Sequence, residues 1–420
     1  MYMERFLQKA NPLDIPRYTT RRYWITVEVP ANTPPGMYET TLQVIANKNT
    51  IASLPYRVEV LPIQLSQAPG MGYFMYLPTW GVPPELRSTS HLKRMFVDMR
   101  KHGMTTATLY PYGLPFDSVM GALRDSELMR TDVPAIWLGA DAVGPAEWKR
   151  VLDLGQARMW PELALYLQDE PGNQERVDNA RRLFKILDQF RQDHPEYRGV
   201  RSTTAIGTSG IKALGAQYDI WIAGAGFGRE MAQQAESMGK LLWSYDCNLA
   251  PVDAENARFY FGWYCWKAGI KGSALWAYSD PGSTGGDGWQ KALKNLSATE
   301  LHYAFVCPTA DDLIPTIGWE AVREGIDDHR YLATLRQAIG RCRKGGRPKA
   351  AATGQGVLDA VTSEITLTGY RAGILGGEAS PHRLGTHYDR VSPQRDLPKA
   401  GYNRWRRRLA DAIIALQQQD

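Results

Sequence analysis

The chain has 420 residues, of which 44% are hydrophobic and 22% charged, a composition typical of globular proteins. Its net charge of +5 is the small difference between 49 basic and 44 acidic residues, so charge alone does not indicate a nucleic-acid partner. The sequence lacks a stretch of about 18 apolar residues, which excludes a membrane-spanning helix. Its first residues also lack the basic and then apolar segments of a signal peptide. A trimmed secreted or periplasmic chain would start no differently from a cytoplasmic one.

Cysteine and histidine spacing argues against a metal or another cofactor. The four cysteines, at 247, 265, 307 and 342, form no Cys-x-x-Cys pair, and the seven histidines show no His-Glu-x-x-His spacing. The even cysteine count permits disulfides without predicting them. Two basic runs, at 341–349 and 404–408, are typical of solvated helix faces, because no nucleic-acid recognition motif accompanies them.

The first part of the chain has the pattern of β-structure. Strands are predicted at 22–29, 38–45 and 56–61, with the Pro- and Gly-rich turn 30–36 between the first two. We therefore expect an N-terminal β-sandwich over residues 1–68. It is shorter than the roughly 100 residues of an immunoglobulin-like unit, so it is either minimal or incomplete.

From residue 69 to residue 346 strands alternate with helices. Eight strands are predicted, at 72–77, 105–110, 133–138, 163–169, 200–206, 218–223, 240–246 and 272–279. Helices lie between most of them, notably at 91–102 and 253–268, and a long one follows at 319–345. Eight such alternations predict an α/β fold, a (β/α)8 barrel. Residues 347–420 form a C-terminal extension with a helix at 402–418, and the stretch 350–400 fits no clear element.

Two adjacent carboxylates, Asp169 and Glu170, end the fourth barrel strand. Pro171 and Gly172 stop the strand, and Asn173 can cap a helix with apolar residues three and four apart from Val177 to Phe190. Catalytic groups of barrels sit at this carboxyl end. Two carboxylates suit the cleavage of glycosidic bonds, in which one acid is protonated and the other charged. The alternative is a solvated turn that favours a helix start.

Both acids can reach one pocket only if the strand leaves regular geometry there, because neighbours on a strand point to opposite sides. The other strand ends carry aromatic and acidic residues that would share the same mouth. These are Tyr110, Tyr112, Trp243, Tyr245, Asp246, Trp276, Tyr278 and Asp280. Such rings can stack on a sugar, although each one alone is more often a packing residue.

Several motifs together resemble the catalytic domain of glycoside hydrolase family 123, the β-N-acetylgalactosaminidases. The motifs are Tyr-Leu-Gln-Asp-Glu-Pro at 166–171, the segments 96–103, 263–276 and 323–332, and the turn at 29–38. The resemblance covers most of residues 20–340. It implies an exo-acting enzyme that removes terminal β-linked GalNAc from a glycan, with retention and without a cofactor.

The resemblance also implies a role for each site residue. The substrate's own 2-acetamido oxygen would attack the anomeric carbon, with Glu170 as general acid and then base. Asp169 would hold the acetamido group, Tyr245 would bond its carbonyl and Trp276 would form the ring platform. Trp243, Tyr110, Asp246 and Tyr278, which the strand ends and not the resemblance assign to the same mouth, complete the expected substrate-binding set.

The sequence is also compatible with two other functions. One is a glycosidase for another sugar with a nucleophilic carboxylate such as Asp246 or Asp280. The other is a carbohydrate-binding barrel without catalysis. The natural glycan, the galacto or gluco preference and a homo-oligomeric state are also left open by the sequence.

Overall fold

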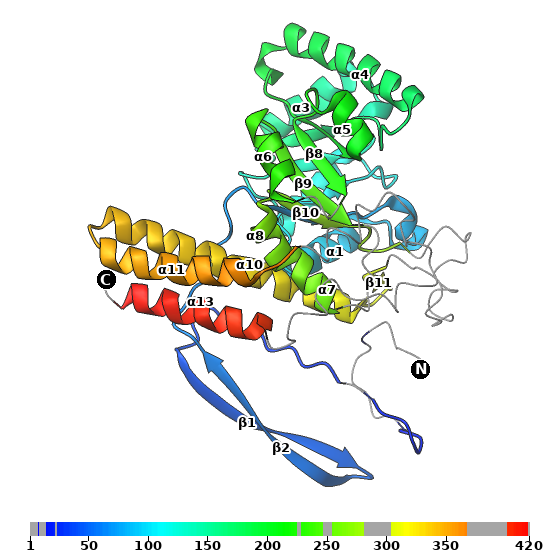
Figure 1. Cartoon of the computed structure of the whole chain (residues 1–420). Coiled ribbons are helices and arrows are strands. Elements are labelled where there is room, and N and C mark those ends of the chain that lie inside the picture. The colour runs from blue at the N-terminus through cyan, green and yellow to red at the C-terminus, as the bar shows by residue number, and fades with distance from the viewer. Residues whose placement is uncertain are drawn as a thin grey trace. The chain divides into compact units, whose positions relative to one another are not determined.

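A computed structural model describes residues 7, 14–21, 23–224, 228–246, 254–280, 304–367 and 401–418 (Figure 1). The chain divides into two compact units. The barrel unit comprises Met1–Gln8, Ala68–His329 and Thr362–Lys399, and the hairpin unit comprises Lys9–Gln67, Arg330–Val361 and Ala400–Asp420. The expected domain limits at 68 and 346 stay predictions.

The barrel unit is built on one eight-stranded parallel sheet with the order β3-β10-β9-β8-β7-β6-β5-β4. Its strands are β3 (Gly72–Met75), β4 (Thr108–Leu109), β5 (Ala135–Trp137), β6 (Leu163–Tyr166), β7 (Ser202–Ile206), β8 (Ile220–Gly224), β9 (Leu241–Asp246) and β10 (Gly272–Leu275). The two end strands also meet, because Thr105 N–H donates to the Tyr73 carbonyl at 2.9 Å and Tyr73 N–H donates to Thr105 Oγ1 at 2.8 Å. The sheet is therefore closed, and the predicted (β/α)8 barrel is confirmed.

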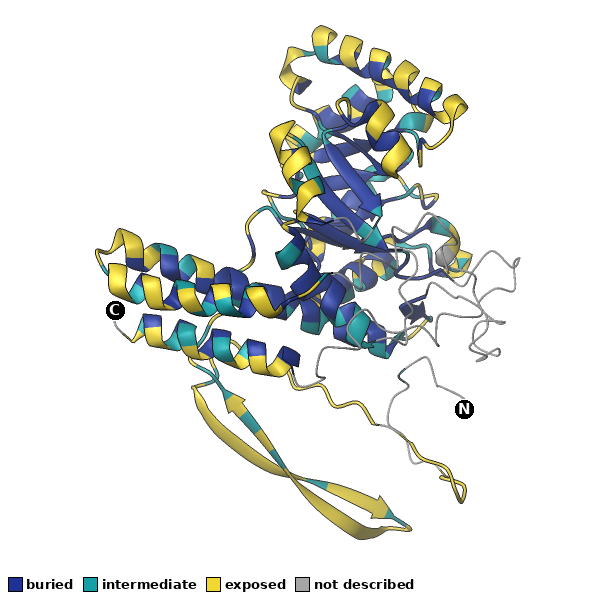
Figure 2. Cartoon of the chain, viewed as in Figure 1, coloured by how far each residue is buried: buried dark blue, intermediate teal, exposed yellow. Residues whose placement is uncertain are grey.

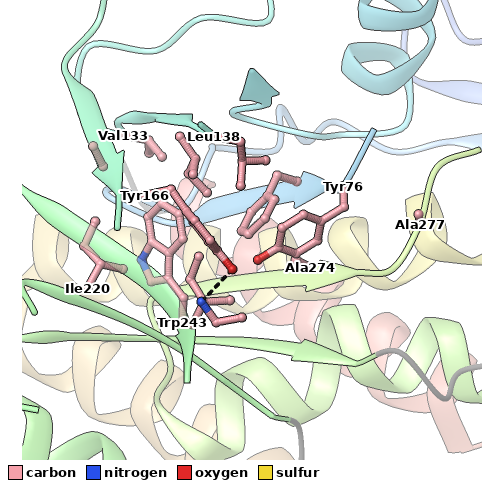
Figure 3. Close-up of a cluster of buried hydrophobic side chains, with 13 residues drawn as sticks. Tyr76, Val133, Leu138, Tyr166, Ile220, Trp243, Ala274 and Ala277 are labelled. Atoms are coloured by element: carbon pink, nitrogen blue, oxygen red, sulfur yellow. Dashed lines mark hydrogen bonds between the residues drawn. The ribbon is translucent and has the colours of Figure 1, made fainter. Parts of the chain in front are cut away.

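The indole of Trp243 lies in the barrel interior, where it packs against two glycines. Trp243 on β9 is only 1% exposed, and a Cβ atom on Gly272 would lie 2.3 Å from its Cγ. A Cβ atom on Gly72 would lie 2.8 Å from the same indole. Figure 3 shows this indole among the buried side chains that the strands contribute. Only glycine at these positions leaves room for the ring, which explains the glycines at the starts of β3 and β10.

Helices surround the sheet and bury one face each (Figure 2). They are α1 (Thr89–Lys101), α2 (Phe116–Asp125), α3 (Pro145–Ala157), α4 (Gln174–Asp193), α5 (Thr208–Leu214), α6 (Arg229–Ser237), α7 (Ala254–Phe259) and α8 (Cys265–Ala268). A π-helical turn, Tyr260–Tyr264, joins α7 to α8. Helix α4 begins at the Asn173 cap and buries every apolar position that its spacing predicted, from Val177 to Phe190.

The barrel unit carries further short elements besides these strands and helices. Short 3-10 turns lie at Thr79–Gly81, Pro84–Leu86, Ala140–Ala142 and Pro195–Tyr197, and an antiparallel pair joins β11 (Val306–Pro308) to β12 (Leu313–Pro315). The long helix α10 (Ile317–Lys344) begins in this unit and ends in the hairpin unit. None of the helices in the described ranges combines the length and apolar character needed to cross a bilayer.

The hairpin unit contains one antiparallel pair, β1 (Gly36–Ala46) and β2 (Asn49–Val60), with the helices α11 (Pro348–Glu364) and α13 (Gly401–Gln417). The predicted strands at 38–45 and 56–61 thus form a small sheet, which Figure 2 shows mostly exposed. The prediction of a strand at 22–29 is wrong, because residues 23–29 are exposed and pair with no strand in the described chain. β-forming residues alone do not make a strand where no partner edge is present.

Two other expectations concern the C-terminal part and the cysteines. The stretch that fitted no clear element contains α11, while residues 368–400 lie outside the described residues. The predicted helix at 402–418 is confirmed as α13. Cys265, Cys307 and Cys342 are buried free thiols, and Cys247 lies outside the described residues.

Candidate active site

The acid pair lies in a turn that follows β6. Gln168 and Glu170 adopt left-handed backbone conformations, with φ angles of 52° and 43°. Such angles are uncommon for residues other than glycine and mark a place where the surrounding structure dictates the backbone. The strand therefore leaves regular geometry at these residues, as two neighbouring acids in one mouth require.

Hydrogen bonds from neighbouring segments of the barrel hold this turn. The Tyr218 hydroxyl donates to the Leu167 carbonyl at 2.6 Å, and Thr204 Oγ1 donates to the Gln168 carbonyl at 2.7 Å. The Gln168 N–H donates to Asp141 Oδ2 at 3.1 Å. The backbone that carries the acids is thus fixed by side chains from three other segments, which preorganises the carboxylates.

Asp169 is held by a tyrosine of its own strand. The Tyr166 hydroxyl donates to Asp169 Oδ1 and accepts the Ala205 N–H at 3.0 Å, the bond drawn in Figure 3. Asp169 is exposed at the mouth, yet desolvation by the surrounding protein raises its pKa. The Tyr166 hydrogen bond opposes that rise, and the neighbouring Glu170 adds to it.

Glu170 is held from the far side of the mouth. The Tyr245 hydroxyl at the end of β9 donates to Glu170 Oε1 at 2.9 Å. Arg176, in the first turn of α4, donates to the Glu170 backbone carbonyl at 3.2 Å. The two adjacent acids therefore have different partners, a buried phenol for Asp169 and a half-exposed phenol for Glu170.

Aromatic rings line the mouth opposite the acid pair. Tyr76, Trp80, Tyr110 and Trp276, which we call the ring group, follow β3, β4 and β10. Ring centroids lie 5.3 Å apart for Tyr76 and Trp276, and 5.9 Å apart both for Trp80 with Trp276 and for Trp80 with Tyr110. Tyr245 joins them, 5.8 Å from Tyr76.

The ring group is close to the acids. The pKa of Tyr110 is raised well above its usual value, first by burial and then by neighbouring charges that include Asp169 and Asp280. The pKa of Tyr166 is raised by burial, by Tyr76 and by Asp169. Figure 3 shows the side chains of Tyr76 and Tyr166 pointing toward one another. The rings and the carboxylates therefore share one mouth.

Five of the expected site residues come together here, and three lie elsewhere. Asp169, Glu170 and Tyr245 meet directly, with Trp276 and Tyr110 in the ring group. Trp243 points into the same barrel two residues deeper than Tyr245, and its 1% exposure keeps it in the core. Tyr278 is fully buried, and its hydroxyl donates to Asp98 Oδ2 on α1 at 2.8 Å.

Asp246 follows Tyr245 on β9 and therefore faces the other side of the sheet. It is 5% exposed, and its charge raises the pKa of the buried Tyr260, after the larger effect of burial. Asp280, by contrast, accepts a hydrogen bond of 2.8 Å from Trp276 Nε1. Of the two alternative carboxylates, Asp280 is the one beside the ring group.

A hollow of about 420 Å3 lies beside Glu170. Its lining comes from the ends of β6 to β9 and the start of α4, namely Glu170, Gly172, Asn173, Arg176, Ile206, Gly207, Gly224 and Tyr245. The volume falls in the range of roughly 300–1,000 Å3 that is usual for small-molecule sites. Among the described residues, no group of three or more His, Cys, Asp or Glu side chains is arranged to hold a metal ion.

The sequence signalled some of these residues and missed others. Tyr76, Trp80, Tyr166 and Arg176 were not expected in the site. Tyr166 stands three residues before Asp169, and Tyr76 stands at the end of the first barrel strand. Their positions at strand ends are the signal that could have identified them.

Comparisons with known proteins concern the fold and the N-terminal sequence. Residues 1–46 match the family model described as the glycoside hydrolase 123 N-terminal domain. A family 123 glycoside hydrolase from Clostridium perfringens, studied for glycolipid glycan hydrolysis, has a similar structure, with a TM-score of 0.61 and 12% identity. The match covers 94% of this chain and 79% of that one.

A glycosyl hydrolase family 2 member from Bacteroides cellulosilyticus matches less well, with a TM-score of 0.33 and 13% identity over 57% of this chain and 34% of that one. None of the curated proteins matches the chain in sequence. The first structural match supports the barrel fold, and the family model adds a relation in sequence at the N-terminus. The chain is therefore similar to glycoside hydrolase family 123 proteins, in sequence over residues 1–46 and in its barrel fold.

Proposed function

We propose that this chain is an exo-acting β-N-acetylgalactosaminidase that cleaves terminal β-linked GalNAc with retention. The observation that carries the proposal is the turn after β6, which presents Asp169 and Glu170 to one mouth lined with rings. The family 123 relative from Clostridium perfringens acts on glycolipid glycans. Glycolipid glycans are accordingly one candidate substrate class for this chain.

The proposed mechanism uses the substrate as its own nucleophile. The 2-acetamido oxygen attacks the anomeric carbon while the Glu170 carboxyl gives its proton to the departing oxygen. A bicyclic oxazolinium-type intermediate forms, and Asp169 stabilises it by accepting the acetamido N–H. Water, deprotonated by Glu170, then opens this intermediate with net retention.

Adjacency of the acids favours this route over a pair of flanking carboxylates. In the usual retaining arrangement the two carboxyl groups stand on opposite faces of the sugar, roughly 5–5.5 Å apart. Two consecutive residues address one side of the sugar, where the glycosidic oxygen and the neighbouring acetamido group both lie. Desolvation around Asp169 strengthens its interaction with the cationic intermediate.

Tyr245 and Trp276 have supporting roles in this proposal. The Tyr245 hydroxyl now donates to Glu170, and with substrate bound it would turn to the acetamido carbonyl and orient the attacking oxygen. The half-buried Trp276 ring, fixed through its Nε1 on Asp280, would form the platform under the pyranose. Both roles depend on the ring group being across the mouth from the acids.

A second candidate function rests on Asp280. This carboxylate is 5% exposed and lies beside Trp276, on the other side of the mouth from Glu170. In a glycosidase without substrate assistance it would attack the anomeric carbon, with Glu170 as acid and base. This enzyme would accept sugars that lack the 2-acetamido group.

Substitutions at the three carboxylates test the two candidates with an aryl β-GalNAc substrate. We expect Glu170→Gln to lower kcat by about a thousandfold or more and Asp169→Asn by about a hundredfold or more. Glu175→Gln, an exposed acid in the first turn of α4, is the matched control and should retain activity. Near wild-type rates in both acid variants would refute the proposal. Loss of activity in Asp280→Asn and Glu170→Gln, with Asp169→Asn near the wild-type rate, would favour the second candidate.

A further inference from the structure

The hollow and the ring group lie on opposite sides of the barrel mouth. In the closed sheet, β6 and β10 are separated by three strands in either direction, so the acid pair faces Trp276. The hollow is lined from β6 to β9, whereas the ring group follows β3, β4 and β10. Glu170 and Tyr245 are positioned between the two regions, since both line the hollow and Tyr245 also contacts Tyr76.

This arrangement separates the two halves of a substrate. The ring group and Asp169 suit the sugar whose bond is cleaved. A general acid must lie between that sugar and its leaving group, because it protonates the oxygen that joins them. The leaving group then extends past Glu170 into the hollow.

One cation, Arg176, stands in the lining of the hollow among the described residues. Its Nη1 donates to the Glu170 backbone carbonyl at 3.2 Å, and its charge lowers the pKa of Asp169 against the larger effect of desolvation. The guanidinium is thus anchored near the acid pair. Among the ion pairs found in the described chain, none involves Arg176, whereas Arg181 on the same helix pairs with Asp178 at 3.1 Å.

We propose that the hollow is the subsite for the leaving-group sugar and that Arg176 selects an anionic one, bearing a carboxylate or a sulfate. The inference rests on the proposed glycosidase function and names the substrate class of the same site. A planar guanidinium can bind either anion through two parallel N–H donors. Neutral sugars would enter the same hollow without this contact.

Glycines on the floor keep the hollow open. A Cβ atom on Gly207 or Gly224 would meet no other atom within 4 Å, and Gly207 has a φ angle of −90° that any residue can adopt. A larger side chain at Gly207 would therefore fill the hollow without backbone strain. Gly199, which likewise has open space around its Cβ position, lies outside the lining and gives a matched control.

A pair of disaccharides tests the selection by charge. The two methyl glycosides carry β-GalNAc on O4 of glucuronate or of glucose, so they differ only in a carboxylate against a hydroxymethyl group. We expect the full-length enzyme to prefer the glucuronate by about fivefold in kcat/KM, the upper range for a solvent-exposed ion pair. Arg176→Gln should reduce the ratio to about one, and Arg181→Gln should retain it. A third disaccharide with glucose 6-sulfate distinguishes sulfate from carboxylate recognition.

Equal rates on all three disaccharides in the wild type, or a preference that survives Arg176→Gln, would overturn the inference. Gly207→Val should lower kcat/KM for every disaccharide, while Gly199→Val should not. If the wild type cleaves neither an aryl β-GalNAc nor the disaccharides, the proposed function fails. Calorimetric affinities of the same sugars then decide the subsite separately, and a glucuronate preference lost in Arg176→Gln would still support it.

Discussion

Tyr245 and Glu170, 75 positions apart in sequence, are joined by a hydrogen bond of 2.9 Å from the phenol to Oε1. The bond links the end of β9 to the turn after β6. It places a hydroxyl donor beside the proposed general acid, at the border between the ring group and the hollow.

The first prediction follows from this bond. Tyr245→Phe retains the ring beside Tyr76 but removes the donor that would orient the acetamido carbonyl. We expect kcat on an aryl β-GalNAc to fall by about ten- to a hundredfold, with a smaller change in KM. Steady-state kinetics measure both constants. Tyr197→Phe, which loses a phenol bond to Asp153 on the outer helices, should leave them unchanged. A KM effect without a kcat effect would contradict the orienting role.

A second prediction concerns the pH dependence set by Asp169. Burial raises the pKa of Asp169, and the Tyr166 hydrogen bond lowers it. In Tyr166→Phe the lowering contribution is lost, so the pKa rises further. Because the mechanism needs Asp169 charged, the acidic limb of the kcat profile should move to higher pH.

The same change should also destabilise the fold, by about 1–3 kcal/mol, because the Ala205 N–H loses its acceptor. Tyr112→Phe removes another buried phenol bond, to the Leu77 carbonyl, and serves as the control. It should lower stability without moving the acidic limb. An unmoved limb in Tyr166→Phe would show that Asp169 does not set it.

A third prediction concerns stability at alkaline pH. Burial alone would lower the pKa of His102, but the charges and hydrogen bonds of Asp98 and Glu320 outweigh it and raise the pKa to about 9. Asp98 also accepts bonds from Tyr278 and Trp319, so the group ties α1 to the segment after β10 and to α10.

Because the folded pKa of His102 lies above the ordinary value of 6.5, its stabilising contribution is complete below pH 6.5 and is lost as pH rises through about 9. Thermal unfolding of wild type and His102→Gln between pH 6 and 10 measures this. The Tm difference between the two proteins should be largest near pH 6 and shrink as pH rises. A constant difference would exclude a charged His102.

A fourth prediction concerns the barrel interior. Gly272→Ala would place a methyl group 2.3 Å from Trp243 Cγ, where it would overlap the indole ring. This ring is buried in the core and cannot move aside without disturbing its neighbours. We expect a loss of about 3 kcal/mol or more, or failure to fold. Gly199→Ala, where the new atom meets nothing within 4 Å, should be nearly neutral in denaturant titrations. An unchanged midpoint for Gly272→Ala would contradict the packing described for Trp243.

The barrel was predictable because its local signals agree with one another. Apolar runs of strand length end in turn residues, and the spacing of α4 matched its buried face from Val177 to Phe190. The strand expected at 22–29 failed because a strand needs a partner edge, which composition does not reveal. Helix α11 was missed because glycine and threonine are weak helix formers, yet its Gly354 packs closely against Leu416 and Ile339.

Within the site, the sequence indicated which strands contribute but not how deep each side chain lies. Trp243 and Tyr245 point into the same barrel, and the step of two residues, roughly 6.6 Å, moves Trp243 from the mouth into the core. Tyr278 pairs with Asp98, a residue 180 positions earlier, which no local pattern signals. Arg176 was not predicted because the sequence pattern of α4 indicates only which face of the helix is buried, and not which polar residues lie near the site.

The most direct measurement of the central claim is inhibition by a galacto-configured thiazoline, a stable mimic of the bicyclic intermediate. If the substrate's acetamido group is the nucleophile, the inhibition constant should lie at least about a hundredfold below the KM of an aryl β-GalNAc, and Asp169→Asn should abolish that advantage. An inhibition constant no lower than KM in the wild type, with hydrolysis intact, would contradict substrate assistance at Asp169 and Glu170.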